Sequence, residues 1–211
     1  MIKNFLTILI PTMLLFGDTH EIPQFWNAYK VSGSLSENYT VSFENDFRTY
    51  NLGQEMHYFH GDIGISFSVF ESYNLSVNFR EVYELKSGVW QQEHRPHVTL
   101  SKKMNIGNLG FSGRTRIEYR LKQDKDGIIR SRDMVALKYN RSFTKFELVP
   151  YIADEIFFDF DKSELNRNRI YLGVEIKNFP VGKPVLYFMQ QRDWNGNRWD
   201  GRNIIGIKLS L

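Results

Sequence analysis

Hydrophobic and polar residues alternate with a period of two along most of this 211-residue chain. Residues 205–211 read Ile-Gly-Ile-Lys-Leu-Ser-Leu, so every odd position is apolar and every even position is small or charged. The same period runs through 109–122 and 166–177. Such alternation is typical of β-strands with two different faces. Further runs of this kind are Tyr39–Tyr50, Ile63–Phe70, Leu75–Leu85, His94–Met104, Ile129–Tyr139, Phe146–Phe158 and Val185–Arg192.

Turn-forming residues separate these runs at short intervals, as at Asn105–Asn108 and Pro180–Lys183. No stretch of the sequence has a helical period or the composition of a linker. The pattern therefore predicts one antiparallel all-β domain over residues 21–211. The runs from Tyr39 to Leu211 make ten strands. The run Gln24–Ser34 then has the wrong parity for an even-stranded barrel, which leaves twelve strands as the alternative.

Residues 1–20 have the pattern of a signal peptide. Lys3 is followed by the apolar run Phe5–Phe16 and then by Gly17 and Asp18. The run is shorter than the about 20 apolar residues of a transmembrane helix, so we expect it to direct export and to be cleaved. The sequence contains no cysteine, which excludes disulfides, thiolate metal sites and a lipoprotein anchor.

Alternation alone fits both a soluble sheet with an apolar core and a membrane barrel with apolar residues facing lipid. Export without a helical anchor favours the membrane barrel. So do runs of about ten residues, the length of a tilted membrane-spanning strand, and aromatic residues near run ends, such as Tyr50, Trp90 and Trp199. We therefore expect an up-and-down transmembrane β-barrel in the bacterial outer membrane. Tight turns are expected on its periplasmic side, at 71–74, 105–108, 140–145 and 178–183. Longer connections are expected outside, at 86–92, 123–128, 159–165 and 193–201.

Several short motifs occur in an order that resembles a known family. They are R-x-R-x-E-x-R at 114–120, P-Y-x-x-x-E-x-F-F at 150–158, R-x-R-x-x-x-G at 167–173 and a glycine-containing last run at 203–209. This order resembles the bacterial outer-membrane β-barrel family catalogued as domain of unknown function 2490. The resemblance spans residues 25–211. It implies the fold and the location, and it implies no activity.

Charged side chains gather on the face opposite the apolar one. If the apolar face meets lipid, these charges line the lumen, where strands about 4.8 Å apart let opposite charges pair. The expected lumen-lining residues are Arg114, Arg116, Glu118, Arg120, Arg130, Arg132, Glu147, Glu155, Arg167, Arg169 and Glu175. The first interpretation is a salt-bridged plug, because a narrow barrel is filled by its own side chains. The second is a basic constriction that selects anions or binds an acidic ligand. In either case we expect loss of Arg116 to leave a carboxylate unpaired.

Other chemistry is sparse in the sequence. The pairs His57-x-x-His60 and His94-x-x-His97 are spaced so that their members point to opposite faces of a strand, and we expect no metal or other cofactor. No nucleophile motif accompanies His94, so a Ser–His hydrolase is not supported. A net charge of +3 is too small to indicate a nucleic-acid partner.

Three functions follow from these observations. The first is a non-enzymatic integral outer-membrane barrel, structural or a narrow pore, which contacts outer-membrane lipid and accepts small anionic solutes. The alternative is a soluble periplasmic β-barrel that binds an apolar ligand. The second alternative is an outer-membrane lipid-modifying enzyme with polar catalytic residues at the lipid boundary. The sequence identifies no protein partner.

Overall fold

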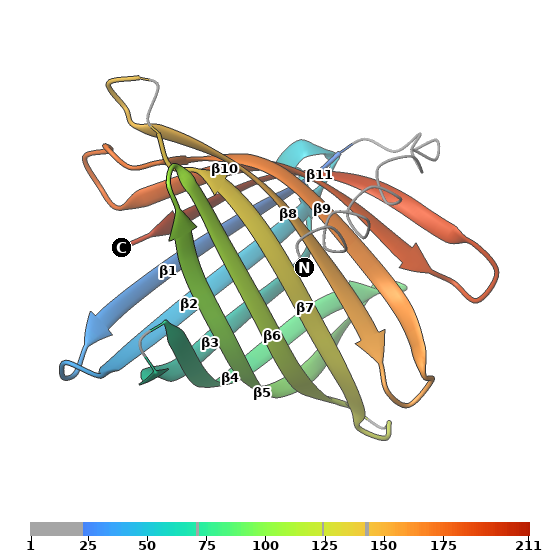
Figure 1. The fold of residues 1–211 in the computed structure, drawn as a ribbon. Helices are drawn as coiled ribbons and strands as arrows, with labels where there is room; N and C mark the ends of the chain where they lie inside the picture. The colour runs from blue at the N-terminus through green and yellow to red at the C-terminus, as the bar shows by residue number, and fades with distance from the viewer. Residues whose placement is uncertain (1–22, 71, 124, 142–143) are drawn as a thin grey trace, which may run out of the picture.

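The computed structural model describes residues 23–70, 72–123, 125–141 and 144–211, so the signal peptide expected over 1–20 lies outside the described residues. Eleven strands follow one another around a closed barrel (Figure 1). They are β1 (Gln24–Ser34), β2 (Tyr39–Tyr50), β3 (Glu55–Phe70), β4 (Tyr73–Lys86), β5 (Val89–Ile106), β6 (Leu109–Lys122), β7 (Ile128–Tyr139), β8 (Leu148–Asp159), β9 (Glu164–Ile176), β10 (Lys183–Trp194) and β11 (Trp199–Ser210). A 3₁₀ turn, Asn51–Gly53, follows β2. Among the described residues, no helix has the length and apolar character needed to cross a membrane.

The alternation in the sequence separates the two faces of the barrel wall. On β6, Ile117 and Tyr119 are exposed on the outside, whereas Glu118 between them is only 1 % exposed. On β9, Leu172 is 63 % exposed and Arg169 is buried. Charged side chains therefore fill the interior and apolar side chains cover the exterior, the reverse of a soluble sheet.

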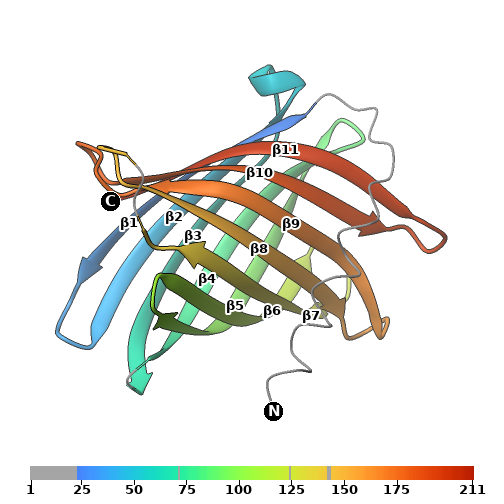
Figure 2. The same ribbon diagram turned by 45° about the horizontal axis from the view of Figure 1, so that its top comes forward.

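The barrel closes through a parallel pair, β1 with β11, whose register runs over seven residue pairs from Gln24↔Ile204 to Lys30↔Ser210. Figure 2 shows the blue first strand beside the red last one. All other neighbouring strands are antiparallel. The predictions of ten or twelve strands are wrong, because a parallel closing pair places Gln24–Ser34 in the wall in spite of its parity.

The two ends of the barrel differ in their connections. We call the end that carries Leu211 the carboxyl end, with connections 35–38, 71–72, 107–108, 140–147 and 177–182; the amino end has connections 51–54, 87–88, 123–127, 160–163 and 195–198. The prediction of a long connection at 86–92 is wrong. Only Ser87 and Gly88 join β4 to β5, both with positive φ (50° and 79°), as a tight two-residue hairpin requires. The longest connection, 140–147, lies at the carboxyl end, so loop length does not distinguish the two sides.

One side of the interior is packed by apolar and aromatic side chains. Trp26, Met189 and Ile204 form a buried cluster against which Tyr187 packs. Tyr187 also covers Gly206 on the neighbouring strand, where an added Cβ would collide with the ring. This packing lines the wall at β1, β10 and β11, whereas most of the charged interior groups come from β2 to β9.

Candidate functional site in the barrel lumen

Glu155 on β8 lies at the centre of the charged interior, with 0 % of the residue exposed. Its carboxylate accepts hydrogen bonds from Arg114 (2.5 Å), Arg132 (2.9 Å) and Arg169 (3.4 Å). The hydroxyl of Tyr171 donates a fourth, at 3.1 Å. Three guanidinium groups, from β6, β7 and β9, therefore share one negative charge.

Glu118 on β6 is the second centre. It accepts hydrogen bonds from Arg130 (2.7 Å) and Arg132 (2.9 Å), so Arg132 bridges Glu118 and Glu155. Arg116 lies 3.8 Å from the Glu118 carboxylate and donates its hydrogen bond to Thr99 instead (3.0 Å). The expectation that loss of Arg116 leaves a carboxylate unpaired is therefore wrong, because Glu118 keeps two other arginines.

Glu93 on β5 is a third centre, which the sequence analysis missed. Arg95 holds both of its oxygens (2.7 and 3.0 Å), and Arg120 from β6 does the same (2.6 and 3.0 Å). Bidentate pairs of this kind are the strongest ion pairs that arginine forms with a carboxylate. Glu93 shares the inward face of β5 with Arg95, His97 and Thr99, but the polar residues Gln92 and His94 on the outer face hide this alternation in the sequence.

Phe157 gives the arginines an aromatic centre. It is buried, and the guanidinium carbons of four arginines lie near its ring: Arg132 and Arg169 at 4.8 Å, Arg130 at 5.0 Å and Arg167 at 5.6 Å from the centroid. Attraction between a cation and a ring face stabilises each contact by about 0.5–2 kcal/mol. The ring therefore helps to hold like charges together in the lumen.

A further cluster on β2 to β4 was also missed. Arg80 pairs with Asp62 (2.7 Å) and Arg48 pairs with Asp46 (2.8 Å). The guanidinium of Arg48 lies 3.6 Å from the Trp26 ring centroid. These residues extend the ion-pair network around the lumen to β1.

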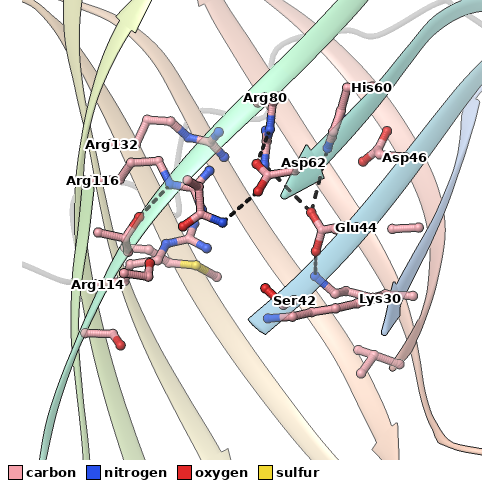
Figure 3. A pocket seen from close by; sticks show the side chains of 18 of the residues that line it. Lys30, Ser42, Glu44, Asp46, His60, Asp62, Arg80, Arg114, Arg116 and Arg132 are labelled. Atoms are coloured by element: carbon pink, nitrogen blue, oxygen red, sulfur yellow. Dashed lines mark hydrogen bonds and ion pairs between the residues drawn. The ribbon is translucent and has the colours of Figure 1, made fainter. Parts of the chain in front are cut away.

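Within the described residues, two cavities of the lumen lie on either side of this network. The larger, about 400 Å³, faces the carboxyl end, and we call it the large chamber. Figure 3 shows Arg114, Arg116 and Arg132 on one side of it, Glu44, Asp46 and His60 on the other, and Arg80 with Asp62 between them.

The second cavity, about 240 Å³, faces the amino end, and we call it the basic chamber. It is lined by Arg48, Tyr58, Arg80, Glu84, Lys86, Arg95, Arg120, Lys122, Arg130, Arg132, Phe157, Arg167 and Arg169. Four of these arginines, Arg48, Arg80, Arg132 and Arg169, also line the large chamber. We call them the arginine layer, because they separate the two cavities.

The structure brings most of the expected lumen residues into this network, and the three that remain are Arg167, Glu175 and Glu147. Arg167 pairs with Asp193 towards the amino end, and Glu175 pairs with Lys138 towards the carboxyl end. Glu147 is exposed in the connection before β8, with φ of 51°. Its amide donates to the Thr144 carbonyl (2.9 Å). The expected strand from Phe146 was wrong, because residues 144–147 form this turn and β8 begins at Leu148.

A polar group also lies on the outer wall, where β4 faces β5. His97 points inside and His94 outside, where His94 Nδ1 lies 2.5 Å from a Glu81 carboxylate oxygen. Gln92 donates to the other Glu81 oxygen and, at 3.3 Å, to the Tyr83 hydroxyl. No group of three or more His, Asp or Glu suited to a metal ion occurs within the described part of the chain.

The fold and the lumen define a closed β-barrel with an ion-paired interior and an apolar outer wall. The chain matches the family described as protein of unknown function DUF2490 over residues 23–202 and belongs to that family. No curated protein matches the sequence. Among solved structures, LpxR from Salmonella typhimurium is similar at 9 % identity and a TM-score of 0.49, over 82 % of this chain and 83 % of that chain. A likeness at that level carries no argument about function.

Proposed function

We propose that this protein is an integral outer-membrane β-barrel whose lumen is closed near its middle. The observation that carries the proposal is the inverted wall. Large apolar side chains such as Ile63, Val135 and Leu172 are exposed, while Glu118 and Glu155 are buried. Soluble monomers rarely expose continuous apolar patches above a few hundred Å², and lipid covers such a surface without penalty.

Aromatic side chains support a membrane of ordinary thickness around this wall. Exposed rings lie near the carboxyl end at Tyr39, Phe70, Phe146 and Phe179, and near the amino end at Tyr50, Trp90, Phe160 and Trp199. Along β2, the eleven steps from Tyr39 to Tyr50 span roughly 36 Å at about 3.3 Å per residue. A strand tilt of about 35–45° reduces this to roughly 26–29 Å, close to the apolar band of about 25 Å in membrane barrels.

Carboxylates on the outer wall accept hydrogen bonds from their neighbours. Asp133 accepts one from Ser131 (2.9 Å), and Asp154 accepts one from Asn168 (2.5 Å). Glu81 is held by Gln92. Such partners lower the free energy needed to place a polar group against lipid, which is consistent with the proposed location.

The ion-pair network supports a closed lumen. Glu118 and Glu155 each pair with two or more arginines, and water does not reach either carboxylate. The arginine layer separates the two chambers. An open pore keeps its charged lining in water. The many charges lining both chambers also argue against a soluble barrel that binds an apolar ligand.

Heat-modifiability and conductance test this proposal together. The detergent-extracted protein is expected to migrate faster on a gel before boiling than after, because a closed barrel resists the detergent until heated. In planar bilayers the folded protein is expected to show no steady conductance. A protein that is soluble without detergent and migrates identically in both states contradicts the membrane location. Steady channel openings contradict the closed lumen.

A second candidate function, lipid hydrolysis, is favoured by the pair Glu81–His94 on the outer wall. Glu81 holds Nδ1 of His94, whose side chain is 47 % exposed and whose Nε2 has no hydrogen bond to a described residue. A carboxylate on Nδ1 orients an imidazole as a general base. Nε2 would take a proton from water as the water oxygen attacks an acyl-ester carbonyl. The proton would then pass to the departing alkoxide, releasing fatty acid and alcohol, with the Tyr83 hydroxyl as a donor to the oxyanion.

Release of fatty acid from phospholipid in mixed micelles tests this second candidate. His94→Asn and Glu81→Gln are expected to abolish release, while Val98→Ala, at an outward position of the same strand, leaves it unchanged. If the unaltered protein releases no more fatty acid than the His94→Asn variant, lipid hydrolysis by this pair is wrong.

A further inference from the structure

The basic chamber carries more positive charge than its surroundings neutralise. Its lining holds eight arginines and two lysines against one carboxylate, Glu84. Nine of these ten cations form ion pairs, which reach eight carboxylates, and four of these carboxylates also pair with other cations. The eight carboxylates are Glu44, Asp46, Asp62, Glu84, Glu93, Glu118, Glu155 and Asp193, and the other cations are Arg114, Arg116, Arg202 and Lys208. Thirteen cationic side chains therefore share eight negative charges, and Lys122 adds a positive charge without an ion pair among the described residues.

Some donors in the lining also have no acceptor. The Nε atoms of Arg130 and Arg132 are buried and form no hydrogen bond within the described structure. Lys122, at the amino end of the chamber, has no carboxylate within 4 Å among the described residues. A buried donor without a partner destabilises the folded protein. An anion in the chamber would supply the missing acceptors and the missing charge.

The shape of the chamber limits the anion. Its volume of about 240 Å³ corresponds to roughly eight water molecules at about 30 Å³ each. Its lining includes Lys86 and Lys122, the last residues of β4 and β6, and Lys86 is exposed. The chamber is therefore reached from solution along the barrel axis, and the wall keeps membrane lipids out of it.

We propose that the basic chamber binds small soluble phosphate compounds with at least two negative charges. Guanidinium groups match the oxygens of phosphate with paired hydrogen bonds, and a multiply charged oxyanion neutralises several arginines at once. This inference goes beyond the proposed membrane location and does not depend on it, because the charges line the inside of the barrel wherever the barrel resides.

A double variant can weaken the site without breaking the network. Lys122→Gln removes a cation that has no ion pair. Arg167→Gln leaves Asp193 paired with Arg202, at 3.2 Å. The matched control is Lys162→Gln with Arg198→Gln, which removes the same two residue types from exposed connections at the same end, outside the chamber.

Calorimetric titration of the folded, full-length protein in detergent with sodium pyrophosphate tests the proposal. We expect saturable binding that weakens as sodium chloride increases. Affinity is expected to fall about tenfold or more in the double variant and to stay within about twofold in the control. The gel shift on boiling verifies that each variant is folded. Absence of binding at millimolar pyrophosphate and low salt overturns the proposal, as does an equal loss of affinity in both double variants.

Discussion

Replacing Glu155 by Gln removes the one negative charge shared by three guanidinium groups, two of them buried. The three arginines differ in the partners that they keep when Glu155 loses its charge. Arg132 keeps Glu118 at 2.9 Å, and Arg114 has a side chain 31 % exposed to water. Arg169 keeps a hydrogen bond to the neutral amide oxygen of Gln191 at 2.8 Å and its ring contacts, but no carboxylate. Breaking a buried ion pair destabilises a protein by about 3–5 kcal/mol. Because one of the three arginines loses all charged partners, we expect about 3 kcal/mol, or a fall in Tm of roughly 6–12 °C for a chain of this size.

Urea unfolding of the reconstituted barrel, followed by tryptophan fluorescence and by the gel shift, measures this change. The matched control is Glu175→Gln, which removes a carboxylate paired with Lys138, a lysine whose side chain is 39 % exposed. A pair at that exposure contributes about 0–1 kcal/mol. If Glu155→Gln is no more destabilising than Glu175→Gln, water reaches Glu155, and the reasoning that the lumen is closed fails.

Three other substitutions probe the wall and the network. Gly206→Ala is expected to destabilise the barrel by about 1–3 kcal/mol through overpacking against Tyr187, whereas Gly113→Ala, which meets open space, leaves urea unfolding nearly unchanged; equal effects would contradict this packing. Ile117→Arg places a charge against lipid at about 2–4 kcal/mol, so the folded fraction on unboiled gels is expected to fall. Arg116→Leu is expected to change thermal stability by less than about 1 kcal/mol, since Glu118 keeps its other arginines; a large loss would mean that Arg116 is an essential partner.

The sequence predicts best what depends on neighbouring residues. The alternation at 109–122 assigns Arg114 and Arg120 to one face and Ile117 to the other, and in the structure the two arginines line the chambers while Ile117 is exposed. It fails over residues 89–93, because outward Trp90 and Gln92 stand beside inward Glu93 and both faces contain polar groups. Where both faces of a strand carry polar residues, alternation cannot predict which residues point into the barrel.

Other features depend on residues far apart in the chain. The place of Gln24–Ser34 is set by its pairing with β11, about 180 positions away, and parity cannot detect a parallel partner. The identity of each ion pair depends on strand register, which is why Glu118 holds Arg130 and Arg132 more closely than Arg116. The contacts of Phe157 with arginines could not be predicted from the motif at 150–158 either, because these arginines come from β7 and β9.

The parallel pair of β1 and β11 differs from all other strand pairs in when it can form during folding. Ten of the eleven strand pairs join segments that follow each other in the chain, and each can form as a local hairpin. The last pair must bring together segments that all the other strands separate, a non-local contact that is slow to form. It has only seven paired residues in its ladder, extended by hydrogen bonds of Leu211 with Lys30 and Ser32. Until it forms, the sheet has two free edges that are open to a second chain, so the hydrogen bonds of Leu211 with Lys30 and Ser32 favour a barrel that closes on itself.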